Sequence, residues 1–443
     1  MLRNFVTGKF SIASDVDIKT TGNTEGAQQV LGLDQVIGKN VALHCHPQNL
    51  IRWAVELDSL ASSVLLVPFD ACEDFSKRVE EKLRLDFVLT DGMTNTGHWT
   101  TKVSRLRAGI GSQEVSSVPN ERNTQWLLAT SGTTGTPKIV AHTIESLTRT
   151  TIQSGAGSQL TWGLLYDPAR FAGFQVVLQA MMANAKLIVP SPNLNFEKKI
   201  DFLVANDCDA LSATPSLWRK ILMAKAAKQL QLKQVTLGGE IADQRILNSL
   251  AKQFPSAAIA HIFASTEAGV GFSVKDKKAG FPVSWLNNGV RDVEMRISDQ
   301  GTLCLKNTHL NQSYLGGGGS IASVDGWIDT GDLVEVDGDR VFFKGRLNGA
   351  INIGGNKVIP EDVEARVLEV SGVFQVAVRA KSSSIAGALI EALIVPDPEV
   401  DNPSGLVKSV KLHCKQVLPS FKVPAFVRLV DELPVGAAGK IKR

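Results

Sequence analysis

Between residues 186 and 263 the chain reads Lys186-Leu187-Ile188-Val189, then Ala210-Leu211-Ser212-Ala213, Gln234-Val235-Thr236-Leu237 and Ile259-Ala260-His261-Ile262-Phe263. These four runs are short and apolar, and they are separated by segments with helical spacing that begin at Phe196, Pro215 and Asp243. Short apolar runs that alternate with helices of ten or more residues indicate βαβ units and parallel sheets covered on both faces.

The same alternation occurs earlier in the chain. Two apolar runs, 40–45 and 63–67, flank an expected helix from Pro47 to about Ala61, and a further amphipathic stretch leads to Phe87-Val88-Leu89. Two such blocks predict an α/β fold whose large N-terminal domain contains doubly wound sheets.

The pattern changes from about Asp292 onward. Alternating residues predict two β hairpins, at 293–305 and 333–343, which would form a β-rich subdomain. Beyond them, helices at 360–370 and 405–417 with three strands predict a small α+β domain. We therefore expect a large domain over residues 1–347 and a small domain over residues 348–443, and the single short segment between them would leave the small domain mobile.

The composition excludes several classes of protein. A chain of 443 residues with 44% hydrophobic and 21% charged residues is typical of a globular protein of two or three domains. Its net charge of +3 is too small to indicate nucleic acid or an anionic membrane as a partner. Five cysteines without a CxxC pair argue against a disulfide framework or a structural zinc site, and they suit a reducing cytoplasm. The polar N-terminus argues against a secretory signal, and three charged residues interrupt the most apolar stretch, 50–68, so no membrane span is expected.

The sequence Thr130-Ser131-Gly132-Thr133-Thr134-Gly135-Thr136-Pro137-Lys138 carries the sharpest functional signal. Its glycines permit close backbone approach, its hydroxyl groups supply donors and its lysine supplies positive charge, as a polyphosphate requires of a loop. It is not a Walker A loop, because Pro137 stands where a glycine must precede the lysine and Ile139 replaces the following Ser or Thr. The alternative is a surface turn rich in Thr and Gly.

This nonapeptide resembles the phosphate loop of the adenylate-forming (AMP-binding) superfamily, of the acyl- and aryl-CoA synthetase type. Phe263-Ala264-Ser265-Thr266-Glu267 is similar to that family's aromatic-Gly-x-Thr-Glu motif, with phenylalanine and alanine in the first two places. Gly326-Trp327-Ile328-Asp329-Thr330-Gly331-Asp332 resembles its Trp-x-x-Thr-Gly-Asp motif. Lys344-Gly345-Arg346 resembles the segment that ends the large domain, and Asn348 stands at the hinge position, where the family usually has Asp or Lys.

Two further motifs follow in the family's order. Ile353–Glu364 resembles its Gly-x-x-Ile-x-Pro-x-Glu-Val-Glu segment. Gly439-Lys440-Ile441-Lys442-Arg443 resembles its C-terminal signature, whose first lysine is catalytic. Taken alone this segment would be a solvated basic tail, but its distance from the small domain favours the signature.

The resemblance implies a role for each motif. The β- and γ-phosphates of ATP would be bound by Thr130, Ser131, Gly132, Thr133, Thr134, Gly135 and Lys138. Phe263 would stack on adenine, Thr266 would contact the α-phosphate and Glu267 would hold magnesium. Thr266 and Glu267 would act in catalysis together with Lys440, which would bridge the substrate carboxylate and the α-phosphate.

Further nucleotide and thiol contacts are implied in the same way. Asp332 and Arg346 would bind the ribose, and Gly354 and Gly355 would line the face that admits a pantetheine thiol. Leu237-Gly238-Gly239-Glu240 resembles the family's adenine-wall segment, which adds Gly239 and Glu240 to the nucleotide site. A simple strand-to-helix turn is the alternative there.

Several other polar residues have a structural interpretation beside a functional one. Arg170 lies where the family usually has a Pro-x-x-His segment, so it would meet a substrate carboxylate or form an ordinary ion pair. His142, His44 and His46 are expected to be structural.

The implied function is ATP-dependent activation of a small carboxylic acid through an acyl-adenylate, followed by transfer to a pantetheine thiol. The product would be an acyl-CoA, and the cofactors would be ATP/AMP, Mg²⁺ and coenzyme A or a carrier-protein phosphopantetheine. The alternatives are an acyl-carrier protein or an amine as acceptor and, in another class, a nucleotide-binding protein without enzymatic activity. We expect a cytoplasmic ligase without a nucleic-acid partner, and we leave homo-oligomerisation open.

Overall fold

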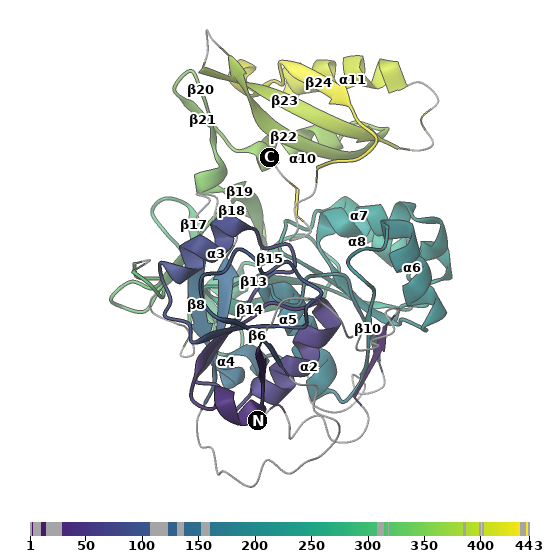
Figure 1. Cartoon of the computed structure of the whole chain (residues 1–443). Helices are drawn as coiled ribbons and strands as arrows, with labels where there is room; N and C mark the ends of the chain where they lie inside the picture. The colour runs from purple at the N-terminus through teal and green to yellow at the C-terminus, as the bar shows by residue number, and fades with distance from the viewer. Residues whose placement is uncertain are drawn as a thin grey trace.

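A computed structural model describes residues 2, 10–14, 29–106, 123–130, 137–151, 160–307, 314–317, 319–383, 387–397, 400, 403–434 and 440–441. The described strands form five sheets. Figure 1 shows the C-terminal residues as a smaller body above a large one.

The first sheet has seven strands in the order β2-β6-β5-β3-β4-β7-β8. In chain order they are β2 (Gln29–Leu31), β3 (Asn40–Leu43), β4 (Ser63–Leu66), β5 (Phe87–Thr90), β6 (Val103–Leu106), β7 (Gln125–Thr130) and β8 (Lys138–His142). The accompanying helices are η1 (Leu33–Val36), α2 (Pro47–Leu57), α3 (Glu73–Glu80) and α4 (Ile144–Thr148). Neighbouring strands are parallel except β7 and β8.

The second sheet has the order β1-β10-β9-β11-β12-β13-β14. Its strands are β1 (Ser11–Ser14), β9 (Thr161–Leu164), β10 (Lys186–Val189), β11 (Ala210–Ala213), β12 (Gln234–Gly238), β13 (Ala258–Ser265) and β14 (Gly269–Val274). Its helices are α5 (Phe171–Met182), α6 (Phe196–Ala205), α7 (Pro215–Met223), η3 (Lys225–Gln229) and α8 (Gln244–Gln253).

The prediction of doubly wound sheets is confirmed, with one difference at the edges. The last strand of each sheet, β8 or β14, is antiparallel to the strand before it. The connections that precede them are too short for the crossover that a parallel neighbour requires, so each forms a hairpin instead.

Three helices of the second sheet begin at side chains that cap them. Asn195, Thr214 and Asp243 each accept a hydrogen bond from the backbone N–H three residues later. Such caps satisfy amide groups that have no partner within the helix. The helix starts predicted at Phe196 and Pro215 are confirmed, and Asp243 is the cap rather than the first residue of α8.

Helix α5 lies in the core between the two large sheets. Nine of its twelve residues are buried, which is expected of a helix covered on most of its circumference. The ring of Phe174 in α5 lies 5.2 Å from that of Trp126 in β7, and both side chains are fully buried. The core formed there includes residues of both sheets.

A third sheet confirms the predicted β-rich subdomain. Its order is β15-β19-β18-β17-β16, and every neighbouring pair is antiparallel. The strands are β15 (Phe281–Pro282), β16 (Glu294–Ile297), β17 (Thr302–Lys306), β18 (Ile328–Asp337) and β19 (Arg340–Arg346), and α9 (Ser284–Asn288) follows β15.

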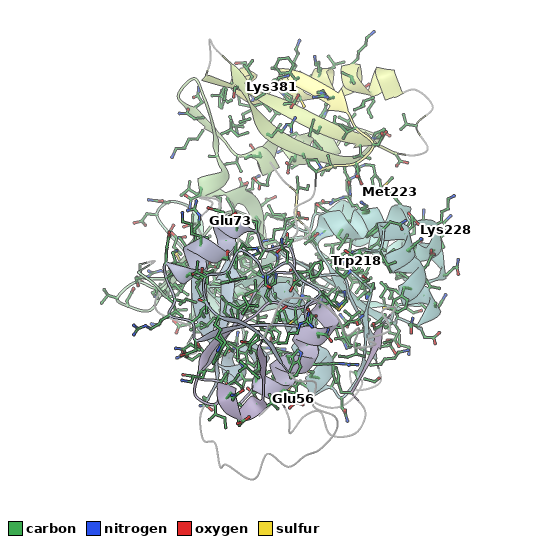
Figure 2. The ribbon with its side chains drawn as sticks, viewed as in Figure 1. Glu56, Glu73, Trp218, Met223, Lys228 and Lys381 are labelled. Carbon is green, nitrogen blue, oxygen red and sulfur yellow. The ribbon has the colours of Figure 1, made fainter. Side chains whose placement is uncertain are left out.

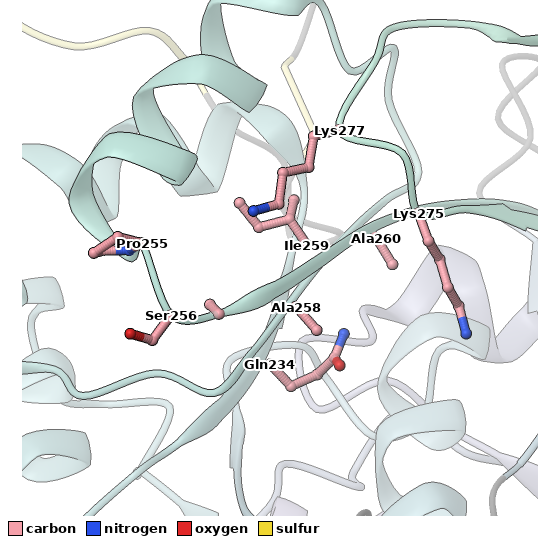
Figure 3. Close-up of a pocket in the computed structure, with 9 residues that line it drawn as sticks. Gln234, Pro255, Ser256, Ala258, Ile259, Ala260, Lys275 and Lys277 are labelled. Atoms are coloured by element: carbon pink, nitrogen blue, oxygen red, sulfur yellow. The ribbon is translucent and has the colours of Figure 1, made fainter.

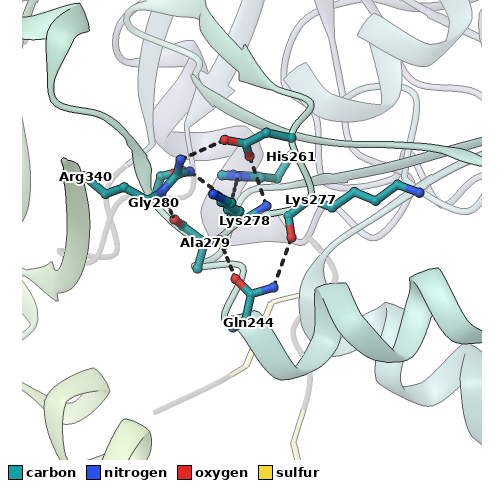
Figure 4. A network of polar contacts seen from close by, with 8 residues as sticks. Gln244, His261, Lys277, Lys278, Ala279, Gly280 and Arg340 are labelled. Carbon is teal, nitrogen blue, oxygen red and sulfur yellow. Dashed lines mark hydrogen bonds and ion pairs between the residues drawn. The ribbon is translucent and has the colours of Figure 1, made fainter. Parts of the chain in front are cut away.

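Arg340 ties this third sheet to the loop after β14. Its guanidinium donates to the carbonyl oxygens of residues 278–280 and pairs with Asp276 at 2.7 Å. Gln244 of α8 and His261 of β13 bind the same loop, as Figure 4 shows. Because charge-assisted hydrogen bonds from a buried guanidinium are strong and directional, Arg340 fixes the place of β19 beside the second sheet.

The C-terminal body is an α+β domain. It contains the hairpin β20 (Ile351–Ile353) and β21 (Asn356–Val358), then α10 (Pro360–Leu368), β22 (Val373–Ser383), β23 (Gly387–Pro396), α11 (Pro403–Val417), η5 (Ser420–Lys422) and β24 (Phe426–Leu429). The short helix η4 (Leu347–Gly349) connects it to β19 and contains the boundary expected at 347/348, which stays a prediction together with the mobility of this domain. In the part of the chain described here, no helix is both long and apolar enough to cross a membrane.

Candidate functional site

Two parallel strands deliver four of the predicted site residues to one edge of the second sheet. Gly239 and Glu240 follow the end of β12, and Thr266 and Glu267 follow the end of β13, its parallel neighbour. In α/β sheets the carboxyl ends of parallel strands are the usual place for ligand binding. The structure therefore brings these two motifs together, although 25 residues lie between Glu240 and Thr266 in the sequence.

The third sheet supplies an ion pair. Asp332 of β18 and Arg346 of β19 are opposite each other in the antiparallel register, and Arg346 Nε donates to Asp332 Oδ1 at 2.9 Å. Burial alone would lower the pKa of Arg346, but the carboxylates of Asp332, Glu267 and Glu361 raise it. The guanidinium thus stays charged and holds Asp332 as an oriented carboxylate.

Lys440 lies among these groups. A Cβ atom built on Gly239 would be 3.2 Å from Lys440 Cε, and the φ of +80° at Gly239 also favours glycine. Part of Lys440 is exposed, but burial of its amino group and the charge of Arg346 lower its pKa, against the opposite effect of Glu240, Asp332 and Glu267. The lysine from the end of the chain therefore stands in the field of three carboxylates and one guanidinium of the large domain.

Glu240 already has two partners in this arrangement. Its Oε2 accepts the backbone N–H of Ser216 at 2.9 Å, and its Oε1 accepts the backbone N–H of Ile441 at 3.0 Å. The prediction that Glu240 contributes to nucleotide binding has no direct test here and stays a prediction.

Tyr314 is a site residue that the sequence reasoning missed. Its hydroxyl donates to Glu267 Oε1 at 3.2 Å, and the Lys138 ammonium lies 4.7 Å from the centre of its ring. Burial raises the pKa of Tyr314 to about 12, and the adjacent Glu267 carboxylate contributes to this shift. Tyr314 thus connects Lys138, at the end of the predicted phosphate loop, with the glutamate expected to hold magnesium. The sequence offered one signal for Tyr314, which is that tyrosine is rare in this chain. There are two tyrosines, and Tyr314 is the one that precedes the glycine run at 316.

Phe263 belongs to an aromatic cluster. Its ring is stacked on those of Phe272 and Phe343, each with centroids 5.2 Å apart. An adenine base would have to share this ring with them, so the stacking role of Phe263 stays a prediction.

His142 packs beside the Thr266 motif. It is 5% exposed, its ring lies 5.8 Å from that of Phe171, and the Thr266 backbone opposes the effect of burial on its pKa. Burial lowers its pKa to about 4, so the imidazole is neutral near pH 7. The expectation that His142 is structural agrees with this packing, through which β8 supports the loop that carries Thr266.

The predicted phosphate loop is described only at its two ends. Thr130 and Lys138 face each other across the antiparallel pair β7–β8, as the expected strand–loop–strand arrangement requires. Ser131, Gly132, Thr133, Thr134 and Gly135 lie outside the described residues.

Gly354 and Gly355 form the turn between β20 and β21. Both have positive φ, +54° and +88°, as the two central residues of a tight hairpin require. A Cβ on either would meet no atom within 4 Å, so these glycines are needed for the turn and not for close packing. Their contact with a pantetheine thiol stays a prediction.

Arg170 forms an ordinary ion pair. Its guanidinium lies 3.2 Å from Asp70 and 4.0 Å from Asp167, which favours the structural alternative. His44 and His46 are likewise buried, as expected. Burial and the neighbouring His98 lower the pKa of His44 to about 4.

Magnesium fits the donors at this edge only together with a phosphate ligand. Among the described residues, no group of three or more His, Cys, Asp and Glu side chains is arranged to hold a metal ion. Mg²⁺ commonly binds through one or two carboxylates plus substrate phosphates, and Glu267 supplies one such carboxylate.

A separate hollow of about 440 Å³ lies at the other end of the second sheet. Gln234 and residues 255–260 line it together with Lys275 and Lys277, as Figure 3 shows. None of the predicted site residues lines this hollow.

Two family models match the chain. The model described as AMP-binding enzyme matches residues 51–315, and that described as AMP-binding enzyme C-terminal domain matches residues 362–440. A 2-succinylbenzoate–CoA ligase of Listeria monocytogenes serotype 4b (strain F2365) is 25% identical over 325 residues, which are 72% of this chain and 68% of the relative. A D-alanine–D-alanyl carrier protein ligase of Staphylococcus aureus (strain MRSA252) is 24% identical over 405 residues, or 85% and 83% of the two chains.

Solved structures show the same fold. The anthranilate CoA ligase AuaEII in complex with anthranoyl-AMP has a TM-score of 0.75 at 17% identity, over 91% of this chain and 86% of the other. The o-succinylbenzoate CoA synthetase of Bacillus subtilis in complex with its acyl-adenylate has a TM-score of 0.68 at 16% identity, over 91% and 87% of the two chains.

Proposed function

Because this chain belongs to the AMP-binding enzyme family, we propose that it joins a small carboxylic acid to the AMP part of ATP and passes the acyl group to a pantetheine thiol. The expected identity as an adenylate-forming ligase is confirmed by the family models and the relatives. The observation that carries the proposal is the place of Lys440, which reaches Gly239 beside the Asp332–Arg346 pair.

The first half-reaction requires charge neutralisation more than covalent chemistry. A carboxylate oxygen attacks the α-phosphorus of ATP and pyrophosphate leaves, so negative charge accumulates on the phosphate oxygens. Lys440 would stabilise that charge, because its ammonium stands among groups of the large domain that are fixed before the reaction. When bound, Mg²⁺ would neutralise phosphate charge, and Glu267 would hold it.

The nucleotide would be positioned by the ion pair of the third sheet. Asp332 would accept hydrogen bonds from the ribose hydroxyls, and Arg346 keeps that carboxylate oriented. Thr130 and Lys138 would contact the β- and γ-phosphates from the two strands that bracket the loop.

The acceptor of the acyl group is proposed to be coenzyme A. The name of the Listeria relative supports this choice, and the name of the Staphylococcus relative supports a carrier-protein phosphopantetheine as the alternative. The five free cysteines suit the reducing cytoplasm in which we place the protein.

The test is a panel of carboxylic acids that includes 2-succinylbenzoate, anthranilate and D-alanine, assayed for pyrophosphate release from ATP and Mg²⁺. An active acid would then be supplied with CoA, a phosphopantetheinylated carrier protein or an amine. Thioester formation with CoA supports the proposal. Pyrophosphate release followed by transfer only to a carrier protein or an amine supports the corresponding alternative, and no release with any acid contradicts adenylation.

A further inference from the structure

One carboxylate of the large domain binds a backbone amide of each domain. Glu240 accepts the N–H of Ser216, in α7, through one oxygen and the N–H of Ile441, next to Lys440, through the other. The two oxygens of a carboxylate suit two N–H donors, and each hydrogen bond is strengthened by the charge.

The bond to Ser216 belongs to a rigid part of the large domain. Ser216 is in the first turn of α7, where the amides have no intrahelical partner and negative charge is favoured. The buried Trp218 fixes the same helix, because its indole N–H donates to the carbonyl of Thr236 at 2.8 Å. Figure 2 shows Trp218 inside the large body and Met223, at the end of α7, on the side that faces the small domain. The bond to Ser216 therefore ties the Glu240 carboxylate to the large domain.

The bond to Ile441 belongs to the small domain. The Ile441 side chain packs against the apolar cluster of Ala377, Leu393, Val395 and Leu433 on one face of the small-domain sheet. The Ile441 backbone N–H points away from this cluster and donates to Glu240. Because Lys440 is the preceding residue, this bond also fixes the backbone next to the lysine. A rotation of the small domain would remove the Ile441 amide and the Lys440 ammonium from Glu240 together.

We propose that Glu240 is a positioning residue that holds the Lys440 segment in the adenylation arrangement of the two domains. This inference rests on the proposed function, because it assigns Glu240 to the first half-reaction only. Glu240 acts through the Ile441 backbone and touches no reacting atom. Once the small domain has turned for thiol transfer, Glu240 keeps its bond to Ser216 and has no further role.

Two of the other contacts between the same domains provide comparisons. Gln375 of β22 donates to the carbonyl of Ser216 at 3.2 Å, and Lys220 of α7 pairs with Glu432 at 2.9 Å. Side chains in the second contact are 41% and 74% exposed, and such surface ion pairs stabilise little. Glu432→Gln is therefore a matched control, since it also replaces an interdomain carboxylate by an amide.

The kinetic test compares Glu240→Ala, Glu240→Gln and Glu432→Gln with the wild-type full chain. Glu240→Ala should lower kcat of adenylation about tenfold through loss of one charge-assisted hydrogen bond to the Lys440 segment, with KM for ATP nearly unchanged. Glu240→Gln should lower kcat less, because it keeps one acceptor oxygen. Thioester formation from a preformed acyl-adenylate should keep its wild-type rate in all three variants, and Glu432→Gln should match the wild type throughout. A higher KM for ATP with kcat preserved would overturn the proposal in favour of nucleotide binding by Glu240, and equal loss in both half-reactions would also overturn it.

Hydrogen–deuterium exchange provides a readout that needs no substrate. In Glu240→Ala the amides of a C-terminal peptide containing Ile441 should exchange faster, whereas the interior of α7 should exchange as in the wild type. Unchanged exchange in the C-terminal peptide would overturn the proposal, and faster exchange throughout α7 would reduce Glu240 to a structural cap. A wild-type chain that releases no pyrophosphate with any acid contradicts the proposed function, while the exchange measurement still decides whether Glu240 holds the segment.

Discussion

Replacing Asp332 tests the assignment of the ribose site. Its side chain is 16% exposed and is oriented by Arg346 Nε at 2.9 Å, so in the folded protein it is a fixed acceptor with a second oxygen for a ligand. Two hydrogen bonds from ribose hydroxyls to this carboxylate, at about 1.5 kcal/mol each, give about 3 kcal/mol. Asp332→Ala should therefore weaken AMP binding roughly 150-fold, and Asp332→Asn, which keeps one acceptor, roughly tenfold.

Titration calorimetry with AMP and with ATP plus Mg²⁺ measures both effects, since both nucleotides carry the ribose. Asp329→Asn is the matched control, because this exposed residue lies on the same strand and accepts the Gly331 N–H, which an asparagine side chain can also accept. The control should bind AMP like the wild type. Unchanged AMP affinity in Asp332→Ala, with the wild-type melting temperature retained, would refute the ribose assignment.

Four other predictions concern catalysis, the metal, acid stability and the hinge. Lys440→Ala should slow adenylation about a hundredfold or more while sparing thioester formation from a preformed acyl-adenylate, and equal loss of both half-reactions in rapid-quench assays would contradict its role. Glu267→Gln should raise the Mg²⁺ concentration needed for half-maximal pyrophosphate release and leave AMP affinity in calorimetry nearly unchanged. His44 and His142 have pKa values lowered from 6.5 to about 4, so the unfolded chain binds more protons between those values and stability present above pH 6.5 is lost toward pH 4. Each histidine accounts for at most about 3 kcal/mol, and urea unfolding of His142→Gln should show a smaller loss in acid than the wild type. Asn348→Pro fixes φ in the connecting segment and should slow thiol transfer relative to adenylation, whereas a ratio equal to the wild type would show that the segment is no hinge.

Local sequence signals predict those helices and strands whose start or pattern is encoded in neighbouring residues of the chain. Helix α7 begins as expected because Thr214 and Pro215 carry a cap and a helix-compatible φ in the chain itself. The strand Val103–Leu106 had no such signal, since Val-Ser-Arg-Leu is neither clearly alternating nor an apolar run. It becomes a strand through its parallel pairing with β5 and β2, and that pairing depends on the assembled sheet.

The site residues also differ in whether the sequence predicts them or whether they depend on tertiary packing. The resemblance of ordered motifs predicts roles for Asp332 and Lys440, because each matches a motif by residue type and by its place in the order. It does not predict which groups meet them in space. Tyr314 reaches Glu267 across 47 residues, and Glu240 reaches Ile441 across 201 residues, so both contacts depend on tertiary packing.

The electrostatics of Lys440 suggest why a backbone contact fixes it. Burial and Arg346 lower the pKa of Lys440, and three carboxylates oppose this effect. Each of these carboxylates already accepts a hydrogen bond: Asp332 from Arg346, Glu240 from Ser216 and Ile441, and Glu267 from Tyr314. Among the ion pairs of the described residues, none includes Lys440. A lysine in a tight ion pair would have to break it before stabilising a phosphate, at a cost comparable to what it gains. A hydrogen bond from the Ile441 amide holds the segment in place and leaves the Lys440 ammonium free to turn toward the developing charge. Glu240→Ala would remove this hydrogen bond and keep the ammonium.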